Sequence, residues 1–262
     1  ATVAPADGRL AETTSHPCCT LRAEPPPAWR AHPSPMSTLR RVLYGAPTSR
    51  VTKVMWIAAE AKVEYARVDL PVEVLKRQGW YLAMQPKGTV PTWIENGRGR
   101  EPLILTESNS IVAYIASEYG CEHGLYPAEP RDIALAWQWQ EYAETTLQPA
   151  LSPVWWGKMK GSGYPPGPNG APTPLNEEKL AVQIERALTV FEPLNEWLSC
   201  REYVLGNTLT FGDISCGVHA NRLFKTRDLA EVAAIKLPSI RVWYDKLLKR
   251  PAFYDNVVPF AK

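Results

Sequence analysis

The stretch TVPTWIENGRGREPLILTESNSIVAYIASEYG, residues 89–120, carries the clearest structural pattern of the chain. Residues 90–95 and 102–106 are rich in β-forming side chains, and the turn residues between them predict an antiparallel hairpin. Residues 107–119 then space their apolar side chains as a helix does, and Gly120 ends the pattern. The stretch therefore predicts two strands followed by a helix.

The residues before this stretch predict a βαβ unit. An apolar run at 39–45 and a second one at 63–70 flank a segment with helical periodicity at 49–62. An irregular or helical link then leads to the hairpin. Together these elements predict an α/β domain with the order βαβ-ββα.

The second half of the chain predicts helices only. Helical periodicity is present in four segments, 131–156, 176–199, 210–224 and 239–250. The sequence therefore predicts the fold class α/β plus all-α. The expected parts are an α/β domain at 37–120, a linker at 121–128 and an all-helical domain at 129–262.

Two segments predict chain without packed structure. Residues 1–36 are rich in proline and small side chains, so we expect a disordered tail. Met36 is a candidate for the true start of the protein. A transit peptide is the competing interpretation of this tail, although such peptides contain few acidic residues. The glycines and prolines of residues 157–175 predict a long surface loop.

Composition excludes several classes of function. The 29 Lys and Arg residues nearly balance the 27 Asp and Glu residues and are interspersed with them, so we expect no nucleic-acid partner and no anionic membrane surface. The sequence contains no run of about 18 apolar residues, which argues against a membrane span. The five cysteines have no metal-ligand spacing, so we expect no metal site and a reducing, cytoplasmic location.

Five segments, taken in their order and spacing, resemble the cytosolic glutathione transferase family. They are LYGAPTSRVTKVMW (43–56), YLAMQPKGTVPTWIENG (81–97), LTESNSIVAYIASEYG (105–120), LTFGDISCG (209–217) and WYDKLLKRPAF (243–253). The resemblance implies a thioredoxin-like fold for the N-terminal domain. It also implies a homodimeric transferase that uses glutathione as a co-substrate, needs no further cofactor, and conjugates a small hydrophobic electrophile.

The same resemblance implies how glutathione is bound. A cis bond before Pro91 would turn the backbone of Val90 toward the tripeptide, which would pair with it as a short added strand. Ser108 would bind the γ-glutamyl carboxylate and Glu107 the ammonium group, at a helix N-terminus that favours anions. The residues alone leave simpler interpretations open, in which Val90 and Pro91 start an edge strand and Ser108 or Thr106 only caps the helix.

Catalysis requires the thiol of glutathione to ionise near neutral pH, and a free cysteine thiol titrates near 8.5. Family members with a Ser-Arg opening to the first helix imply Ser49 as the hydroxyl donor to the thiolate. Thr48 is the alternative in another branch of the family, and Tyr44 is a third candidate. One of Thr48 and Ser49 is also expected to cap the helix. Further candidate contacts to the tripeptide are Arg50, Lys87 and Thr89.

Two features of the helical half have competing interpretations. Trp155, Trp156, Met159 and Tyr164 either line a pocket for the electrophile or form ordinary core. Thr210 and Asp213 have the spacing of a capping box, which indicates a role in folding rather than in catalysis. The alternatives to a transferase on this scaffold are a glutathione-dependent disulfide reductase or peroxidase, and a non-catalytic interaction module.

Overall fold

The computed structural model describes residues 41–96, 101–167, 171–227 and 229–260. The predicted tail at 1–36 lies outside these residues. The N-terminal part consists of β1 (Arg41–Tyr44), α1 (Ser49–Glu60), β2 (Ala66–Val68), α2 (Val72–Leu75), α3 (Gly79–Met84), β3 (Thr92–Glu95), β4 (Leu103–Thr106) and α4 (Ser108–Tyr119). A short 3₁₀ turn, η2 (Cys121–His123), follows α4.

The four strands form one mixed sheet in the order β2-β1-β3-β4. β1 runs parallel to β2, which confirms the predicted βαβ unit. β3 pairs antiparallel with both β1 and β4, which confirms the predicted hairpin. This is the arrangement of a thioredoxin-like domain, and it makes β3 an interior strand.

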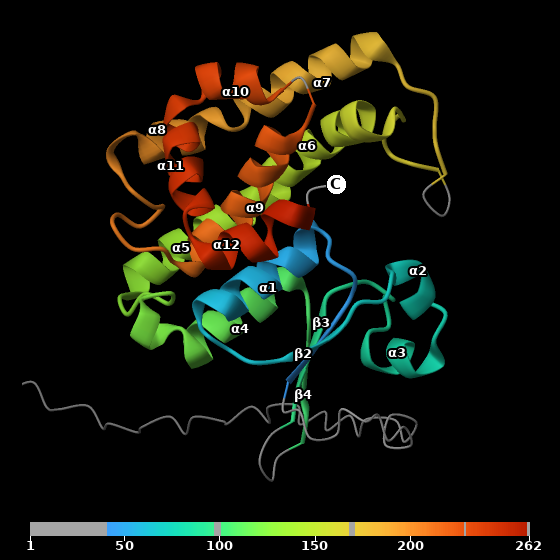
Figure 1. Ribbon diagram of the computed structural model, residues 1–262, viewed down its shortest axis with the longest axis vertical. Helices are drawn as coiled ribbons and strands as arrows, with labels where there is room; N and C mark the ends of the chain where they lie inside the picture. Colours follow the sequence, from blue (N-terminus) through green and yellow to red (C-terminus); the bar gives the residue numbers. More distant parts are fainter. Residues whose placement is uncertain (1–40, 97–100, 168–170, 228, 261–262) are drawn as a thin grey trace, which may run out of the picture.

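The two faces of the sheet are covered by different helices (Figure 1). Leu43 and Trp93 are paired across β1 and β3 and belong to the core formed with α1 and α4. Because successive side chains of a strand point to opposite faces, Tyr44 and Thr92 point the other way, toward α3. There the ring of Tyr44 lies 6.1 Å from the ring of Tyr81, and Tyr81 Oη lies 2.9 Å from Thr92 Oγ1.

The second half of the described chain is helical, as predicted. Its elements are α5 (Pro130–Tyr142), η3 (Ala143–Leu147), α6 (Gln148–Trp155), η4 (Trp156–Lys160), α7 (Glu177–Thr189), α8 (Glu192–Trp197), η6 (Leu198–Cys200), α9 (Phe211–Lys225), α10 (Ala230–Lys236), α11 (Pro238–Leu248), α12 (Pro251–Asn256) and η7 (Val258–Phe260). Two of these, η3 and η4, are π-helical turns that continue α5 and α6.

Several helix boundaries differ from the prediction. Residues 176–199 form two α-helices, because Pro193 fits the first turn of a new helix but not the interior of a long one. The surface loop predicted at 157–175 starts only at Gly161, whose positive φ of 61° ends η4. Helices α10 and α12 were not predicted, because 7 and 6 residues are too few for a clear periodicity.

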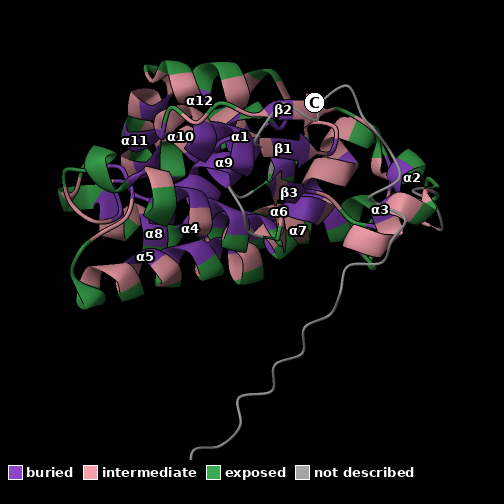
Figure 2. Cartoon of the chain, turned by 90° about the horizontal axis from the view of Figure 1, so that it is seen from below, coloured by how far each residue is buried: buried purple, intermediate pink, exposed green. Residues whose placement is uncertain are grey.

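Helix α9 is the centre of the helical half and is buried along most of its length (Figure 2). Thr210 and Asp213 form the predicted capping box at its start. A Cβ atom on Gly217 would lie 2.7 Å from the Trp56 ring, so a glycine allows α9 and α1 to pack closely. Both halves of the chain therefore share one continuous core. None of the described helices is long and apolar enough to cross a bilayer.

Candidate functional site

The sheet register brings the three segments that contain the predicted site residues to the same end of the strands. Tyr44 pairs with Thr92, and Thr92 pairs with Thr106. At this end of the strands, the chain leaves β1 toward α1, enters β3 from Pro91, and leaves β4 toward α4. The N-termini of two helices thus flank the Val90-Pro91 segment.

The turn between β1 and α1 packs directly on this segment. Gly45 has a φ of 126°, and a Cβ atom there would lie 2.8 Å from the Cβ of Val90. Thr48 is the N-cap residue of α1, with an exposed side chain that makes no capping hydrogen bond within the described part of the chain. Ser49 is the first residue of α1, and its side chain lies outside what the structure describes. Of the two capping residues that the sequence offers, Thr48 therefore makes no cap, and the prediction for Ser49 falls on a side chain outside the described residues.

The segment around Val90 has an unusual backbone. The Val90-Pro91 peptide bond is cis, as predicted. Because β3 is interior, the interpretation of this segment as the start of an edge strand is wrong. The carbonyl of Thr89, whose side chain is exposed, accepts a hydrogen bond of 2.6 Å from Tyr81 Oη. Within the described residues, neither the N–H nor the C=O of Val90 has a hydrogen-bond partner.

Helix α4 begins with an unusual backbone conformation. Its N-cap is Glu107, which has a φ of 66°, a region that non-glycine residues seldom adopt. The alternative interpretation that Ser108 or Thr106 only caps the helix is wrong, because the N-cap residue is Glu107 and no side-chain capping hydrogen bond is present there among the described residues. The exposed carboxylate of Glu107 forms an ion pair of 3.0 Å with Lys87. The pairing of Thr92 with Thr106 puts the start of α4 at the same end of the strands as the Val90-Pro91 segment.

Two further candidates lie on different sides of the sheet. Tyr44 points toward α3 and away from the face that α1 covers, which disfavours it as a donor at the α1 N-terminus. Burial raises the pKa of the Tyr44 hydroxyl. Arg50 is exposed in the first turn of α1, and no ion pair joins it to another described residue.

A buried polar network behind α1 was missed by the sequence analysis. Lys53 is fully buried, and its Nζ atom donates to Glu144 of η3 and lies 3.4 Å from Asn109 Oδ1 of α4. Glu144 Oε1 also lies 3.2 Å from Nε2 of the buried His219. Ser215 donates to Asn109 Oδ1 at 3.1 Å. We call these five residues the interdomain network, since they join α1 and α4 to the helical half.

The charges of this network are set by burial and by mutual pairing. Burial lowers the pKa of Lys53, while Glu144 opposes that change. For Glu144, burial acts to raise the pKa, but hydrogen bonding from His219 and the charge of Lys53 hold it well below its usual range. Burial lowers the pKa of His219 to about 4. At neutral pH, Glu144 is therefore an anion and His219 is neutral.

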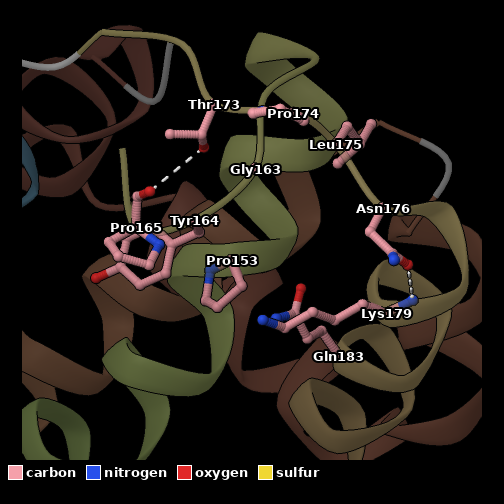
Figure 3. A pocket seen from close by; sticks show the side chains of 10 residues that line it. All are labelled: Pro153, Gly163, Tyr164, Pro165, Thr173, Pro174, Leu175, Asn176, Lys179 and Gln183. Carbon is pink, nitrogen blue, oxygen red and sulfur yellow. Dashed lines mark hydrogen bonds between the residues drawn. The ribbon is translucent and has the colours of Figure 1, made fainter. Parts of the chain in front are cut away.

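The aromatic candidates of the helical half are not core residues. Trp155, Trp156 and Met159 are half-buried, and Tyr164 is exposed in the loop after η4. A pocket of about 350 Å³ lies between this loop and the helices α6 and α7, and its lining side chains are drawn in Figure 3. Its lining residues are Pro153, Gly163, Tyr164, Pro165, Thr173, Pro174, Leu175, Asn176, Lys179 and Gln183.

The sequence and the fold match known proteins over most of the described chain. Residues 43–128 match the family model described as "Glutathione S-transferase, N-terminal domain". The chain is 26% identical over 215 residues to Glutathione S-transferase D6 of Drosophila melanogaster, a match that covers 81% of this chain and 88% of that protein. It is 27% identical over 215 residues to the Disulfide-bond oxidoreductase YfcG of Escherichia coli, with 80% and 91% covered.

A solved structure gives the same result for the fold. The theta class glutathione S-transferase of Xanthomonas axonopodis pv. citri, determined with glutathione bound, has a TM-score of 0.70 to this chain at 26% identity. The match covers 84% of this chain and 97% of the other.

Proposed function

We propose, from the premise that this chain belongs to the glutathione S-transferase family, that it conjugates glutathione to a small hydrophobic electrophile. The relatives of this family support a glutathione-dependent activity. The single observation that supports the proposal most is the unpaired backbone of Val90, which lies between the N-termini of α1 and α4.

The binding step uses three segments at one end of the sheet's strands. The N–H and C=O of Val90 pair with the backbone of the tripeptide as one further antiparallel strand would. The γ-glutamyl carboxylate binds the Ser108 hydroxyl and the free amides of α4, where the helix dipole favours an anion. Glu107 binds the ammonium group and exchanges its exposed ion pair with Lys87, a pair that is worth little in water. Further contacts come from Thr89 and Arg50.

The chemical step uses the first turn of α1. Lowering a thiol pKa by about two units requires about 2.7 kcal/mol of preferential stabilisation of the thiolate. The unpaired amides at the α1 N-terminus and the Ser49 hydroxyl supply it, with Thr48 as the alternative donor. The thiolate attacks the electrophile, a carbon–sulfur bond forms, and the leaving group departs or the acceptor takes up a proton.

The test compares Ser49→Ala and Thr48→Ala with the wild type. We measure the thiolate of bound glutathione by ultraviolet absorbance as a function of pH, together with glutathione affinity. For Ser49→Ala, we expect the apparent thiol pKa to rise by one unit or more at nearly unchanged affinity. Thr48→Ala serves as the matched control and should leave the apparent thiol pKa unchanged. If the two variants exchange these behaviours, Thr48 is the donor.

Disulfide reduction with glutathione is the second candidate function. It is favoured by the match to the disulfide-bond oxidoreductase and by the exposed hydroxyl of Thr48 at the α1 N-cap. Comparing turnover of hydroxyethyl disulfide with turnover of an aromatic halide separates the two activities. A chain that does not bind glutathione at all would instead be an interaction module.

Assembly and location are carried over from the family as proposals. We propose a homodimer, tested by light scattering during size-exclusion chromatography, and a cytoplasmic location, tested by fractionation of the source cells.

A further inference from the structure

Arg222, in the last turn of α9, has an unusual environment. Its guanidinium lies over the ring of Trp155 from α6, with 4.5 Å between Cζ and the ring centroid. Burial lowers the pKa of Arg222 to about 10, the nearby Tyr164 opposes this change, and the charge of Arg50 adds to it. The side chain still carries its charge at neutral pH. Within the described residues, no carboxylate forms an ion pair with it.

The surroundings of Arg222 add positive charge instead of neutralising it. Lys160 places its Nζ 5.2 Å from the centroid of the same Trp155 ring. Arg50, in the first turn of α1, is close enough to act on the charges of both Arg222 and Lys53. The carboxylate of Glu144 is already engaged by Lys53 and His219. Arg222 is half-buried, whereas Arg50 and Lys160 are exposed. Because a charge that is partly withdrawn from water is normally paired, Arg222 lacks an anion among the described residues.

We propose that Arg222 and the Trp155 ring form a subsite for the anionic group of the second substrate. The occupant is a flat, apolar electrophile that carries a carboxylate. Its ring packs against Trp155 and Tyr164, and the guanidinium of Arg222 binds the carboxylate with charge-assisted hydrogen bonds. This assignment rests on the proposed function, because Arg50 directly follows Ser49 and places the subsite beside the thiolate.

A balanced reaction with such a substrate is aromatic substitution. With 4-chloro-3-nitrobenzoate, the thiolate of glutathione forms a bond to the carbon that bears chlorine. The carbon–chlorine bond breaks and chloride leaves, while the proton of the original thiol goes to solvent. The carboxylate keeps its charge throughout, so it acts only in binding and orientation.

The glycine end of glutathione also carries a carboxylate, which is the alternative anion for Arg222 to bind. The two sources predict different kinetic effects when the charge of Arg222 is removed. If Arg222 binds the second substrate, the loss depends on whether that substrate is charged. If it binds glutathione, KM for glutathione rises with every acceptor.

The experiment compares 4-chloro-3-nitrobenzoate with its methyl ester in the wild type and in Arg222→Met, which keeps an unbranched side chain over Trp155. We expect kcat/KM to fall about 10- to 100-fold for the acid and less than threefold for the ester, at unchanged KM for glutathione. Arg222→Lys should recover part of the loss. Arg201→Met is the matched control, because Arg201 lies 3.9 Å over Trp197 on another surface.

Two kinetic results would overturn the proposal. Equal losses for acid and ester would assign Arg222 a structural role, and a raised KM for glutathione with both acceptors would assign it to the tripeptide. Calorimetric titration with the unreactive 4-nitrobenzoate and 4-nitrobenzamide tests binding without any reaction. Tighter binding of the acid by the wild type but not by Arg222→Met supports the subsite even if neither halide is conjugated, in which case only the proposed function fails. No preference for the acid overturns the subsite.

Discussion

Replacing Glu144 by Gln tests how strongly the interdomain network holds the two halves of the chain together. The change removes a negative charge but keeps an oxygen that accepts a hydrogen bond. Lys53 is fully buried and would lose the carboxylate that its ammonium contacts. Removing one partner of a buried ion pair typically costs about 3 to 5 kcal/mol, because the remaining charge is uncompensated.

The ordinary pKa of lysine sets an upper limit to this cost. Lys53 can escape its unfavourable charge by losing the proton, and doing so at pH 7 costs about 5 kcal/mol for a lysine with an ordinary pKa near 10.4. We therefore expect Glu144→Gln to lower the free energy of unfolding by about 3 to 5 kcal/mol, a large part of a typical total of about 5 to 15 kcal/mol. Urea unfolding at pH 7, followed by circular dichroism, measures it.

Two further variants make this prediction refutable. Glu141→Gln is the matched control, because Glu141 is an exposed carboxylate that accepts a hydrogen bond of 3.1 Å from the same Asn109, and it should cost less than about 1 kcal/mol. The double variant Lys53→Met with Glu144→Gln should be more stable than Glu144→Gln alone, since no buried charge remains unpaired. A single variant that stays within 1 kcal/mol of wild type, or a double variant with no recovery, would show that the pair is not what stabilises this interface.

Two other predictions concern α9. The pKa of His219 is lowered to about 4 by burial, against about 6.5 in an unfolded chain, so the unfolded state binds the extra proton between these values and stability falls as pH drops through this window. The loss of stability amounts to at most about 3 kcal/mol. Urea unfolding between pH 7 and pH 4 should show that the free energy of unfolding depends less on pH in His219→Gln than in wild type. An equal pH dependence in the two proteins would contradict this. Thr210→Ala should lower stability by about 1 kcal/mol at unchanged kcat, because the hydroxyl belongs to the capping box. A loss of kcat at unchanged melting temperature would contradict that.

The fold was largely predictable because its signals are local. The β-forming side chains at 90–95 and 102–106 and the apolar spacing of the next helix each involve only neighbouring residues, and the paired strands and the helix that they predict are confirmed. The capping box at Thr210 was found in the same way. The positive φ of Glu107 at the predicted helix start was not, because this conformation has no side-chain signature unless the residue is glycine.

The interdomain network was not predictable, because its partners are far apart in the sequence. Lys53 and Glu144 are separated by 91 positions, and Glu144 and His219 by 75. The one local signal is that Lys53 lies among apolar residues on a helix that the core surrounds. A lysine in such a position requires a buried partner, but its identity depends on how α1 packs against helices that only tertiary structure places.

One face of α9 connects these observations. Ser215, His219 and Arg222 are spaced by four and three residues, so they lie on the same side of the helix. From the start of that face to its end, they contact Asn109 next to the α4 N-terminus, then Glu144 behind α1, and finally Trp155. The two ends of the face therefore meet opposite ends of the proposed reaction complex, the γ-glutamyl group and the second substrate. A shift of α9 along its axis would therefore move the contacts at both ends together. We expect changes at the middle residue, His219, to alter both the KM for glutathione and the KM for the acceptor. Changes at Arg222 should alter only the KM for the acceptor.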